Sequence, residues 1–403
     1  MTECWVPGAD ETDFGIGALP YGVLERDDGS AYVAVRIGDR ALDLTSATAE
    51  HAPGLARLFT EPSLDALMAA GRDRWRQTRE EIAHWLTDPA WSQRLKAHLR
   101  PLGTTRARLP FTVADYVDFY ASRTHAETVG AIFRPGADPL PPNWLHLPIG
   151  YHGRAGTVVV SGSDVARPHG QRRSGDAAPE FGPTSKLDIE AEVGFVVGSP
   201  SRRGEPVSVD GFAEHVFGVV LVNDWSARDI QRWEGAPLGP FLGKSFATSI
   251  SAWVLPLAAL STAWIPAPRP ALPVLPYLRG ENQRGLRLTV QVELNGTVIA
   301  RPPFESMYWT PAQMLAHLTV NGASLRTGDL FASGTVSGPG IDQRGCLLEL
   351  TADGRDAITL DDGGTRSYLD DGDEVVITAT APGIGGRRIG LGEVRGRILP
   401  ARM

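Results

Sequence analysis

The segment Leu286-Arg-Leu-Thr-Val-Gln-Val-Glu-Leu294 alternates apolar and polar residues and runs directly into Asn295-Gly296. Alternation with a period of two is typical of a β-strand with one buried face, and Asn-Gly is the strongest short signal for a hairpin turn. The segment therefore predicts a strand that ends in a tight turn. Asn295 also begins a glycosylation sequon, which we interpret as part of the turn because nothing else in the sequence indicates secretion.

Similar short apolar runs, separated by Gly/Pro turns, lie on both sides of this segment from Phe111 onward. They predict that residues 111–403 form a mostly β domain of mixed sheets or a rolled barrel, and the 45 glycines and 31 prolines suit its many tight turns. Helices are expected only over 210–215 and 311–318, with a proline-rich surface excursion at 266–276. The expected strands include 157–161, 192–197, 216–222, 347–351 and 374–378.

Residues 1–110 are predicted to form a separate small β module with helices attached. A turn at 27–30 separates two of its expected strands. Ser63 is the expected N-cap of a helix that ends at Gly71, and a second helix carries Trp75, Ile82, Trp85 and Leu86 on one face. The module contains no evident cluster of chemically active side chains. Its expected strands are 21–24, 31–37 and 42–44, and its expected helices are 64–70, 75–86 and 91–99.

The bulk composition limits the class of protein. The 403 residues carry 47 acidic and 39 basic side chains, a net charge of −8, which argues against nucleic-acid binding. No apolar run reaches the ~20 residues of a membrane span, and the first residues lack the features of a signal peptide. Two cysteines, Cys4 and Cys346, are too few for a disulfide framework. We therefore expect a protein of the reducing cytoplasm that makes no membrane contact.

Four short segments hold more polar side chains than a core element needs. The first, 115–134, begins Asp115-Tyr-Val-Asp-Phe-Tyr-Ala-Ser-Arg-Thr-His125 and turns polar after Phe119. Because unpaired polar groups are costly to bury, we interpret it as the wall of a site. The other three segments are 187–193, 222–231 and 240–248.

Each candidate in these segments also has a plainer interpretation. Glu190 and Glu192 lie two residues apart, so a strand projects both from one face, but a surface pair is an equally good interpretation. Asp224 suits either a site rim or the N-cap of a helix. Taken alone, Lys244 favours a surface position and His125 a structural role.

Together, four carboxylates form a candidate metal site: Asp118, Glu190, Glu192 and Asp224. Hard cations such as Ca²⁺ and Mg²⁺ prefer oxygen ligands, and a bound cation relieves repulsion among the carboxylates. No zinc pattern is present, because cysteines are few and HExxH is absent. The Gly-rich segments 150–153 and 383–386 lack the Lys-Ser/Thr of a phosphate loop, which argues against nucleotide binding.

Long motifs in the sequence resemble the fumarylacetoacetase family, over a range from about Tyr21 to Leu399. The motifs are Asp115 to His125 as quoted above, Pro142-Asn-Trp-Leu-His-Leu-Pro-Ile-Gly-Tyr-His-Gly-Arg154, Asn223-Asp-Trp-Ser-Ala-Arg-Asp-Ile-Gln231, Pro237-Leu-Gly-Pro-Phe-Leu-Gly-Lys-Ser-Phe246 and Ala332-Ser-Gly-Thr-Val-Ser-Gly-Pro339. The resemblance implies a small SH3-like N-terminal domain followed by a mixed β-sandwich or β-roll, in a homodimer. It also implies metal-dependent hydrolysis of a carbon–carbon bond in 4-fumarylacetoacetate. The products are fumarate and acetoacetate, in the last step of tyrosine and phenylalanine catabolism through homogentisate.

The resemblance also implies a role for each matching residue. The catalytic residues are the general base His125, its orienting carboxylate Glu349, and three groups that stabilise negative charge, Arg134, Gln231 and Lys244. The first metal is held by Asp118, Glu190, Glu192 and Asp224, and a second Mg²⁺-linked position lies near Lys244 and Thr248. The substrate contacts are Tyr120, Arg134, Tyr151, Gln231 and Thr335.

One position departs from the family pattern: Gly235 stands where the family has a substrate-contacting tyrosine. This departure leaves the substrate preference open. The alternatives are a related acylpyruvate-type hydrolase, or a keto-acid decarboxylase or isomerase of the same superfamily. The His125–Glu349 pair weighs against the last two, because water activation needs such a pair. A metal-stabilised binding protein without catalysis is the third class considered.

Overall fold

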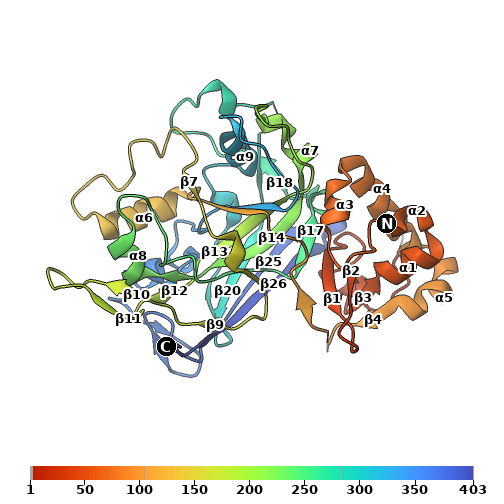
Figure 1. Cartoon of the computed structure of the whole chain (residues 1–403), viewed down its shortest axis with the longest axis horizontal. Helices are drawn as coiled ribbons and strands as arrows, with labels where there is room; N and C mark the ends of the chain where they lie inside the picture. Colours follow the sequence, from red (N-terminus) through yellow and green to blue (C-terminus); the bar gives the residue numbers. More distant parts are fainter. Residues whose placement is uncertain (1–2, 104, 282, 403) are drawn as a thin grey trace.

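The computed structural model describes residues 3–103, 105–281 and 283–402. Figure 1 shows two lobes, a small N-terminal one in red and orange and a larger one in the remaining colours. Within the described residues the architecture is mixed α/β, with sheet as the main component, as the sequence predicts. No helix in these ranges combines the length and the apolar character that a membrane crossing requires.

The N-terminal lobe is a β-meander that packs against helices. Strands β1, β2, β3 and β4 pair antiparallel in chain order, and β5 pairs with β1. The bounds are β1 Tyr21–Glu25, β2 Ala31–Ile37, β3 Arg40–Asp43, α1 Leu44–His51, α2 Pro53–Ala56, α3 Asp65–Ala69, α4 Arg72–Thr87, α5 Ser92–Leu95, β4 Leu99–Pro101 and β5 Ala107–Arg108.

The large lobe contains two principal sheets, and β1 extends the first of them into the N-terminal lobe. That sheet runs β4-β3-β2-β1-β17-β14-β13-β22-β6-β7, and the second runs β21-β20-β25-β26-β9. Their further bounds are β6 Asp115–Phe119, β7 Gly150–His152, β8 Val158–Val160, β9 Val165–Ala166, β13 Ala191–Val197, β14 Val216–Asp224, β16 Thr248–Ile250, β17 Trp253–Pro256, β20 Thr289–Leu294, β21 Thr297–Ala300, β22 Asp329–Ala332, β25 Glu374–Pro382 and β26 Arg388–Leu399.

Short helices and strand pairs surround these sheets. They are α6 Arg123–Phe133, β10 His169–Arg172, β11 Glu180–Pro183, β12 Leu187–Asp188, α7 Phe212–His215, β15 Ser226–Ala227, α8 Arg228–Glu234, β18 Trp264–Pro266, β19 Arg284–Leu286, α9 Pro311–Thr319, α10 Leu347–Leu350, β23 Ile358–Thr359 and β24 Thr365–Arg366. Since the strand order of each principal sheet has two different ends, neither closes into a barrel within the described residues.

The predicted hairpin is present. Strands β20 and β21 pair antiparallel around Asn295 and Gly296, whose φ angles of 50° and 82° place both in the left-handed region that this turn requires. Strands β13 and β14 are buried along their whole length, which explains their continuous apolar runs. They form the centre of the first sheet, between β17 and β22.

Two predictions of secondary structure are wrong, and the predicted helix stop at Gly71 is confirmed. Segment 347–351 forms the helix α10 instead of a strand, because the Asp188 carboxylate accepts from the backbone N–H groups of Leu347 and Leu348. Segment 91–99 is broken into short 3₁₀ and α turns that end in β4. Helix α3 ends at Ala69 with Ala70 as its C-cap, directly before Gly71 as predicted, and Gly71, with φ of 82°, is also the N-cap of α4.

Apart from α10, four helices of the described residues were not expected from the sequence: α1, α2, α6 and α8. Helix α6 begins after Ser122, whose hydroxyl accepts from the backbone N–H of His125. Helix α8 begins after Ala227, so Asp224 ends strand β14 and is not a helix cap. Of the predicted excursion at 266–276, Pro266 ends β18 and Pro276 begins a 3₁₀ helix, while 267–275 contains no helix or strand. The SH3-like description of the N-terminal lobe stays a prediction.

Candidate active site

Four buried carboxylates meet at the centre of the first sheet. Asp118 lies on β6, Glu192 on β13 and Asp224 at the end of β14, while Glu190 directly precedes β13. One oxygen from each side chain lies within 4.8 Å of those of the other three. The strand order places β14, β13, β22 and β6 side by side, so the sheet gathers residues that lie more than a hundred positions apart in the sequence.

Two of the four carboxylates have unsatisfied oxygens. Both oxygens of Glu192 and the Oδ1 of Asp118 are buried and form no hydrogen bond within the described residues. Burial, then the neighbouring acidic groups, raise the pKa of Glu192 and of Asp118 well above the ordinary range. Because carboxylate oxygens are the ligands of hard cations, the orphaned oxygens fit a bound divalent ion.

The other two carboxylates are held by cations of the protein. The Lys244 ammonium lies 2.7 Å from Asp224 Oδ2 and 2.9 Å from Glu190 Oε2, and Arg228 donates to Glu190 Oε1 at 2.6 Å. Burial raises the pKa of Glu190, but Lys244 and Arg228 outweigh it and hold that pKa below its usual range. The Thr248 hydroxyl donates to Asp224 Oδ1 at 3.1 Å.

A buried histidine–carboxylate pair adjoins this cluster. His125 Nδ1 lies 2.6 Å from Glu349 Oε2, and the Ser337 hydroxyl donates to the same oxygen at 2.6 Å. Burial raises the pKa of Glu349, but His125 and Ser337 outweigh it, so this pKa lies below its usual value. An ionised Glu349 holds the imidazole with the proton on Nδ1, which leaves Nε2 free to accept a proton.

A buried network connects the two groups. Arg228 donates to Asp188 Oδ2 at 2.8 Å as well as to Glu190. Asp188 in turn accepts from the backbone N–H groups of Leu347 and Leu348, at 2.7 and 2.9 Å, in the first turn of the helix that carries Glu349. Sequence reasoning assigned no role to Asp188 or Arg228. The sequence feature that could have identified them is their position in segments 187–193 and 222–231, which already contained candidate site residues.

The predicted substrate contacts lie at different distances from this centre. The hydroxyl groups of Tyr151 and Thr335 are buried and form no hydrogen bond within the described residues. The Tyr120 ring packs edge-on against His125 with centroids 5.3 Å apart, and Gln231 Oε1 accepts from Arg228 at 3.2 Å. Arg134 lies at the exposed end of α6, donates to the Pro139 carbonyl at 2.6 Å and makes no ion pair with the four carboxylates in the described chain.

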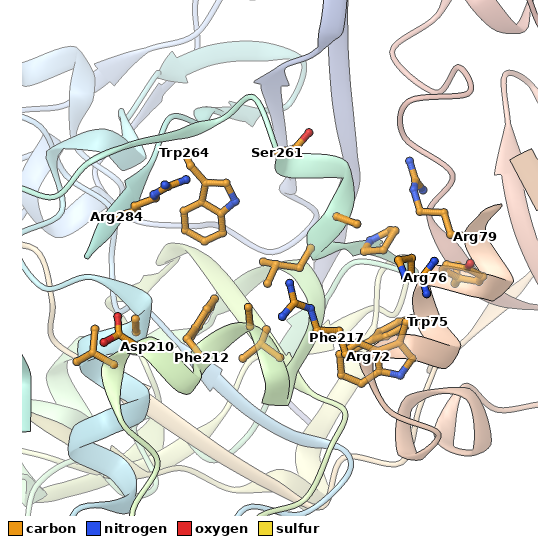
Figure 2. Close-up of a pocket in the computed structure, with 18 residues that line it drawn as sticks. Arg72, Trp75, Arg76, Arg79, Asp210, Phe212, Phe217, Ser261, Trp264 and Arg284 are labelled. Carbon is orange, nitrogen blue, oxygen red and sulfur yellow. The ribbon is translucent and has the colours of Figure 1, made fainter. Parts of the chain in front are cut away.

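A cavity of about 230 Å³ reaches one of the four carboxylates, Asp224, and Tyr151, Lys244 and Thr248 also line it. A second cavity, of about 580 Å³, shares none of its lining with the predicted site. Figure 2 shows this second cavity, which is lined by Trp75 on α4 and by Phe217 and Trp264 on the large lobe. Its position marks the joint between the lobes.

A buried histidine–carboxylate pair beside a cluster of carboxylates that could hold a metal ion is an arrangement that suits a metal-assisted hydrolase. The family model "Fumarylacetoacetate (FAA) hydrolase C-terminal" matches residues 115–399, and "Fumarylacetoacetase N-terminal" matches residues 17–112. The chain belongs to the fumarylacetoacetase family.

Curated relatives match along nearly their whole length. The Homo sapiens fumarylacetoacetase is 44% identical over 416 residues, which cover 98% of this chain and 99% of the relative. The Oryza sativa subsp. japonica fumarylacetoacetase is 42% identical, and the matched residues cover 98% of this chain and 97% of the relative.

Solved structures share the fold at lower identity. A fumarylacetoacetate hydrolase from Exiguobacterium antarcticum aligns with a TM-score of 0.56 at 17% identity, covering 95% of this chain and 100% of its own. A 5-carboxymethyl-2-hydroxymuconate delta-isomerase from Mycobacterium smegmatis aligns with a TM-score of 0.52 at 16% identity. The alignment covers 96% of this chain and 100% of the isomerase chain. The fold therefore supports more than one reaction.

Proposed function

We propose that this protein is a metal-dependent fumarylacetoacetase, an enzyme of tyrosine catabolism that hydrolyses 4-fumarylacetoacetate to fumarate and acetoacetate. The observation that carries the proposal is the His125–Glu349 pair, 2.6 Å apart and buried beside the four carboxylates. The full-length identity to curated fumarylacetoacetases supports the same activity.

His125 is proposed as the general base. Glu349 accepts the hydrogen bond from Nδ1–H, so Nε2 can remove a proton from the attacking water while the imidazolium that forms is stabilised by the ionised Glu349. A positioned base of this kind typically contributes about 10²–10⁴ in rate. The water then attacks the carbonyl carbon, and the carbon–carbon bond to the acetoacetate carbon breaks.

The departing acetoacetate carbon carries negative charge, and Lys244 is the proposed group that stabilises and protonates it. Burial opposes a charged ammonium, but Asp224 and Glu190 outweigh it and raise the pKa of Lys244, which keeps the side chain protonated. Removing one such charge-stabilising donor typically costs about 3–4 kcal/mol of transition-state stabilisation. Arg134 and Gln231 are proposed to assist in the same way.

Ca²⁺ or Mg²⁺ is the proposed metal, held by Asp118, Glu190, Glu192 and Asp224. When bound, such a cation supplies a Lewis acid that polarises and orients the two oxygens of a β-diketone. The second, Mg²⁺-linked position near Lys244 and Thr248 stays a prediction. A protonated ammonium has no lone pair to offer a cation, so Lys244 would contribute there through its backbone carbonyl oxygen.

Tyr120, Tyr151 and Thr335 are proposed to contact the diketo acid substrate. The unpaired hydroxyl groups of Tyr151 and Thr335 support this assignment, because buried hydroxyl groups normally have a partner. At Gly235, an added Cβ would lie 2.8 Å from the Gln231 carbonyl oxygen, so a larger side chain there requires a shift of the α8 terminus. This is the position where we expect substrate preference to differ from relatives that carry tyrosine.

The test is the near-ultraviolet absorbance of the diketone, which falls as the bond is cleaved. We expect metal-loaded protein to consume fumarylacetoacetate, and His125→Ala to abolish turnover while metal binding and the folded structure are retained. The matched control is His84→Ala, an exposed histidine of the N-terminal lobe, which should keep full activity. Cleavage by the His125→Ala variant would contradict the proposed mechanism.

The second candidate is a keto-acid isomerase or decarboxylase, which the shared fold with the delta-isomerase favours. Product analysis separates the two. Hydrolysis yields equal amounts of fumarate and acetoacetate, whereas an isomerase returns a product of unchanged mass and a decarboxylase releases CO₂. An acylpyruvate-type hydrolase would instead prefer a pyruvate-containing diketone in competition assays.

A homodimer is proposed as the assembly. The segment that leads to Lys244 exposes large apolar side chains, with Leu238 95% and Leu242 46% exposed. Contiguous apolar exposure of this kind is typical of a protein–protein interface, and a second copy is the proposed partner. Light scattering on the wild type and on Leu238→Asp tests it: we expect a dimer that the substitution weakens, and a monomeric wild type would exclude it.

The remaining predictions stay proposals. A cytoplasmic location is supported by Cys4 and Cys346, which are both free thiols. The division into residues 1–110 and 111–403 is supported by the separate helical cover of the N-terminal lobe in Figure 1.

A further inference from the structure

The N-terminal lobe holds a second group of possible metal ligands, where the sequence indicated no chemistry. Glu50 and His51 lie in the last turn of α1, and His98 ends the 3₁₀ helix η3, Lys96–His98. One ligand atom from each residue lies within 4.8 Å of the other two. Because 48 positions separate Glu50 from His98, no local motif connects them.

The spacing of the three ligand atoms suits a small tetrahedral ion. Glu50 Oε2 lies 3.2 Å from His98 Nε2, and Glu50 Oε1 lies 3.6 Å from His51 Nε2. Zinc binds imidazole nitrogen and carboxylate oxygen at about 2.0–2.2 Å, which sets ligand atoms of a tetrahedron about 3.3 Å apart. The contact between His98 Nε2 and Glu50 Oε2 is also a hydrogen bond, so a bound ion would replace that hydrogen bond.

Ser46 orients the His98 ring for this role. Its Oγ lies 2.8 Å from His98 Nδ1 and 3.4 Å from the Asp43 carbonyl oxygen. When an ion replaces the hydrogen bond from Nε2–H to Glu50, the hydroxyl can donate to Asp43 and accept from Nδ1–H, so that the lone pair of Nε2 faces the ion. Histidines that bind metals usually donate their other ring N–H in this way.

The His51 ring provides an independent observation. Its Nε2 is buried and forms no hydrogen bond within the described residues, and the side chain as a whole is only 13% exposed. Trp91 and His98 pack edge-on against the ring, each with centroids 5.6 Å away, and fix its direction. A buried ring nitrogen without a partner is uncommon, and a metal ion would satisfy it.

We propose that Glu50, His51 and His98 bind a zinc ion, with water from the exposed Glu50 side as the fourth ligand. Imidazole nitrogen suits zinc and related transition metals, whereas the all-oxygen cluster of the active site suits Ca²⁺ or Mg²⁺. The ion would tie the end of α1 to η3 and would not enter the reaction. The proposal is independent of the proposed function.

The test is a calorimetric titration of metal-free protein with Zn²⁺ in the presence of excess Mg²⁺. We expect His98→Gln and His51→Gln to lose one equivalent of bound Zn²⁺ relative to the wild type. His84→Gln is the matched control, since His84 also lies beside Trp91 and near a carboxylate, Asp88, but is exposed. With Co²⁺ in place of Zn²⁺, we expect the visible absorption of a tetrahedral ion, lost in the same two variants.

Two further variants keep the test decisive if a histidine variant fails to fold. Glu50→Gln changes an exposed side chain and should lower the Zn²⁺ affinity. Ser46→Ala should weaken it about 10–100-fold while the number of bound ions stays unchanged. Equal Zn²⁺ stoichiometry and affinity in the wild type and all four ligand-set variants would overturn the proposal, as would loss of all tightly bound Zn²⁺ in Glu192→Gln.

Discussion

Carboxylates only a few ångströms apart in the active site have opposite electrostatic surroundings. Glu190 receives two cations, Lys244 and Arg228, and its pKa falls. Glu192, two residues further along, forms no ion pair within the described residues, and burial raises its pKa well above the usual range. The sequence predicts that both side chains project from one face of a strand. It does not predict which of them pairs with Lys244 and Arg228, because these two residues lie on other segments of the chain.

Substituting Glu192 by glutamine should separate metal binding from folding. Below its raised pKa, Glu192 must bind a proton to be buried, whereas the amide is neutral without one, so we expect the metal-free variant to be about 1–3 kcal/mol more stable than the wild type at neutral pH. The stabilisation that Ca²⁺ or Mg²⁺ gives the wild type should be absent in the variant. Thermal unfolding with and without the cation measures both effects. A variant that is stabilised by the cation as strongly as the wild type would exclude Glu192 as a ligand.

Metal binding should release protons near neutral pH. The raised pKa values of Asp118 and Glu192 mean that the metal-free folded protein holds protons that the unfolded chain loses above about pH 4. Between that pH and the raised pKa values, the stability of the metal-free protein therefore falls as pH rises. A cation displaces these protons, so calorimetric enthalpies should depend on the ionisation enthalpy of the buffer. Identical enthalpies in phosphate and Tris would contradict this account.

At the scale of elements, α10 shows why part of the site escaped prediction. Leu347-Leu-Glu-Leu reads as a short buried strand, since apolar runs of this length do not distinguish strand from helix. The segment becomes a helix because Asp188, far away in the chain, accepts two of its backbone N–H groups. The hairpin at Asn295-Gly296 and the buried strands β13 and β14 were predictable, because turn chemistry and apolar runs determine them locally.

Asp188→Asn should impair the enzyme through α10. The change removes the charge that pairs with Arg228, and breaking a buried pair of this kind typically costs about 3–5 kcal/mol. Asp188 is a positioning residue for Glu349, so we expect kcat to fall about 10–100-fold with KM little changed, and the pH–rate profile to shift. Asp356→Asn, an exposed change in the same region of the chain, is the control. Unchanged kcat in Asp188→Asn would show that α10 needs no such anchor.

The whole molecule is connected across the joint between its lobes. Strand β1 pairs with β17, so the N-terminal meander continues the central sheet. The rings of Tyr21 and Trp75 both contact Phe217, with centroids 5.8 and 5.3 Å apart. One apolar cluster includes residues of both lobes, among them Val23, Phe217 and Val220.

We therefore expect the two lobes to unfold together. Because β1 fills an edge of the central sheet and shares its core, separating the lobes would expose both an unpaired strand and apolar surface. Calorimetry should record one transition for the metal-loaded chain, and residues 111–403 expressed alone should aggregate. Two resolved transitions, or a soluble and active 111–403 fragment, would show that the joint is energetically weak.

The shared position of Arg228, between Glu190 and Asp188, has a consequence for communication within the enzyme. A cation bound at the carboxylates should hold Glu190 in place, and through Arg228 and Asp188 this restraint reaches the first turn of α10. Coupling between two sites is reciprocal, so whatever orders α10 should also tighten cation binding. The amide protons of Leu347 and Leu348 should then exchange with solvent more slowly when the cation is present. Their exchange rates would report how well α10 holds Glu349 in position beside His125.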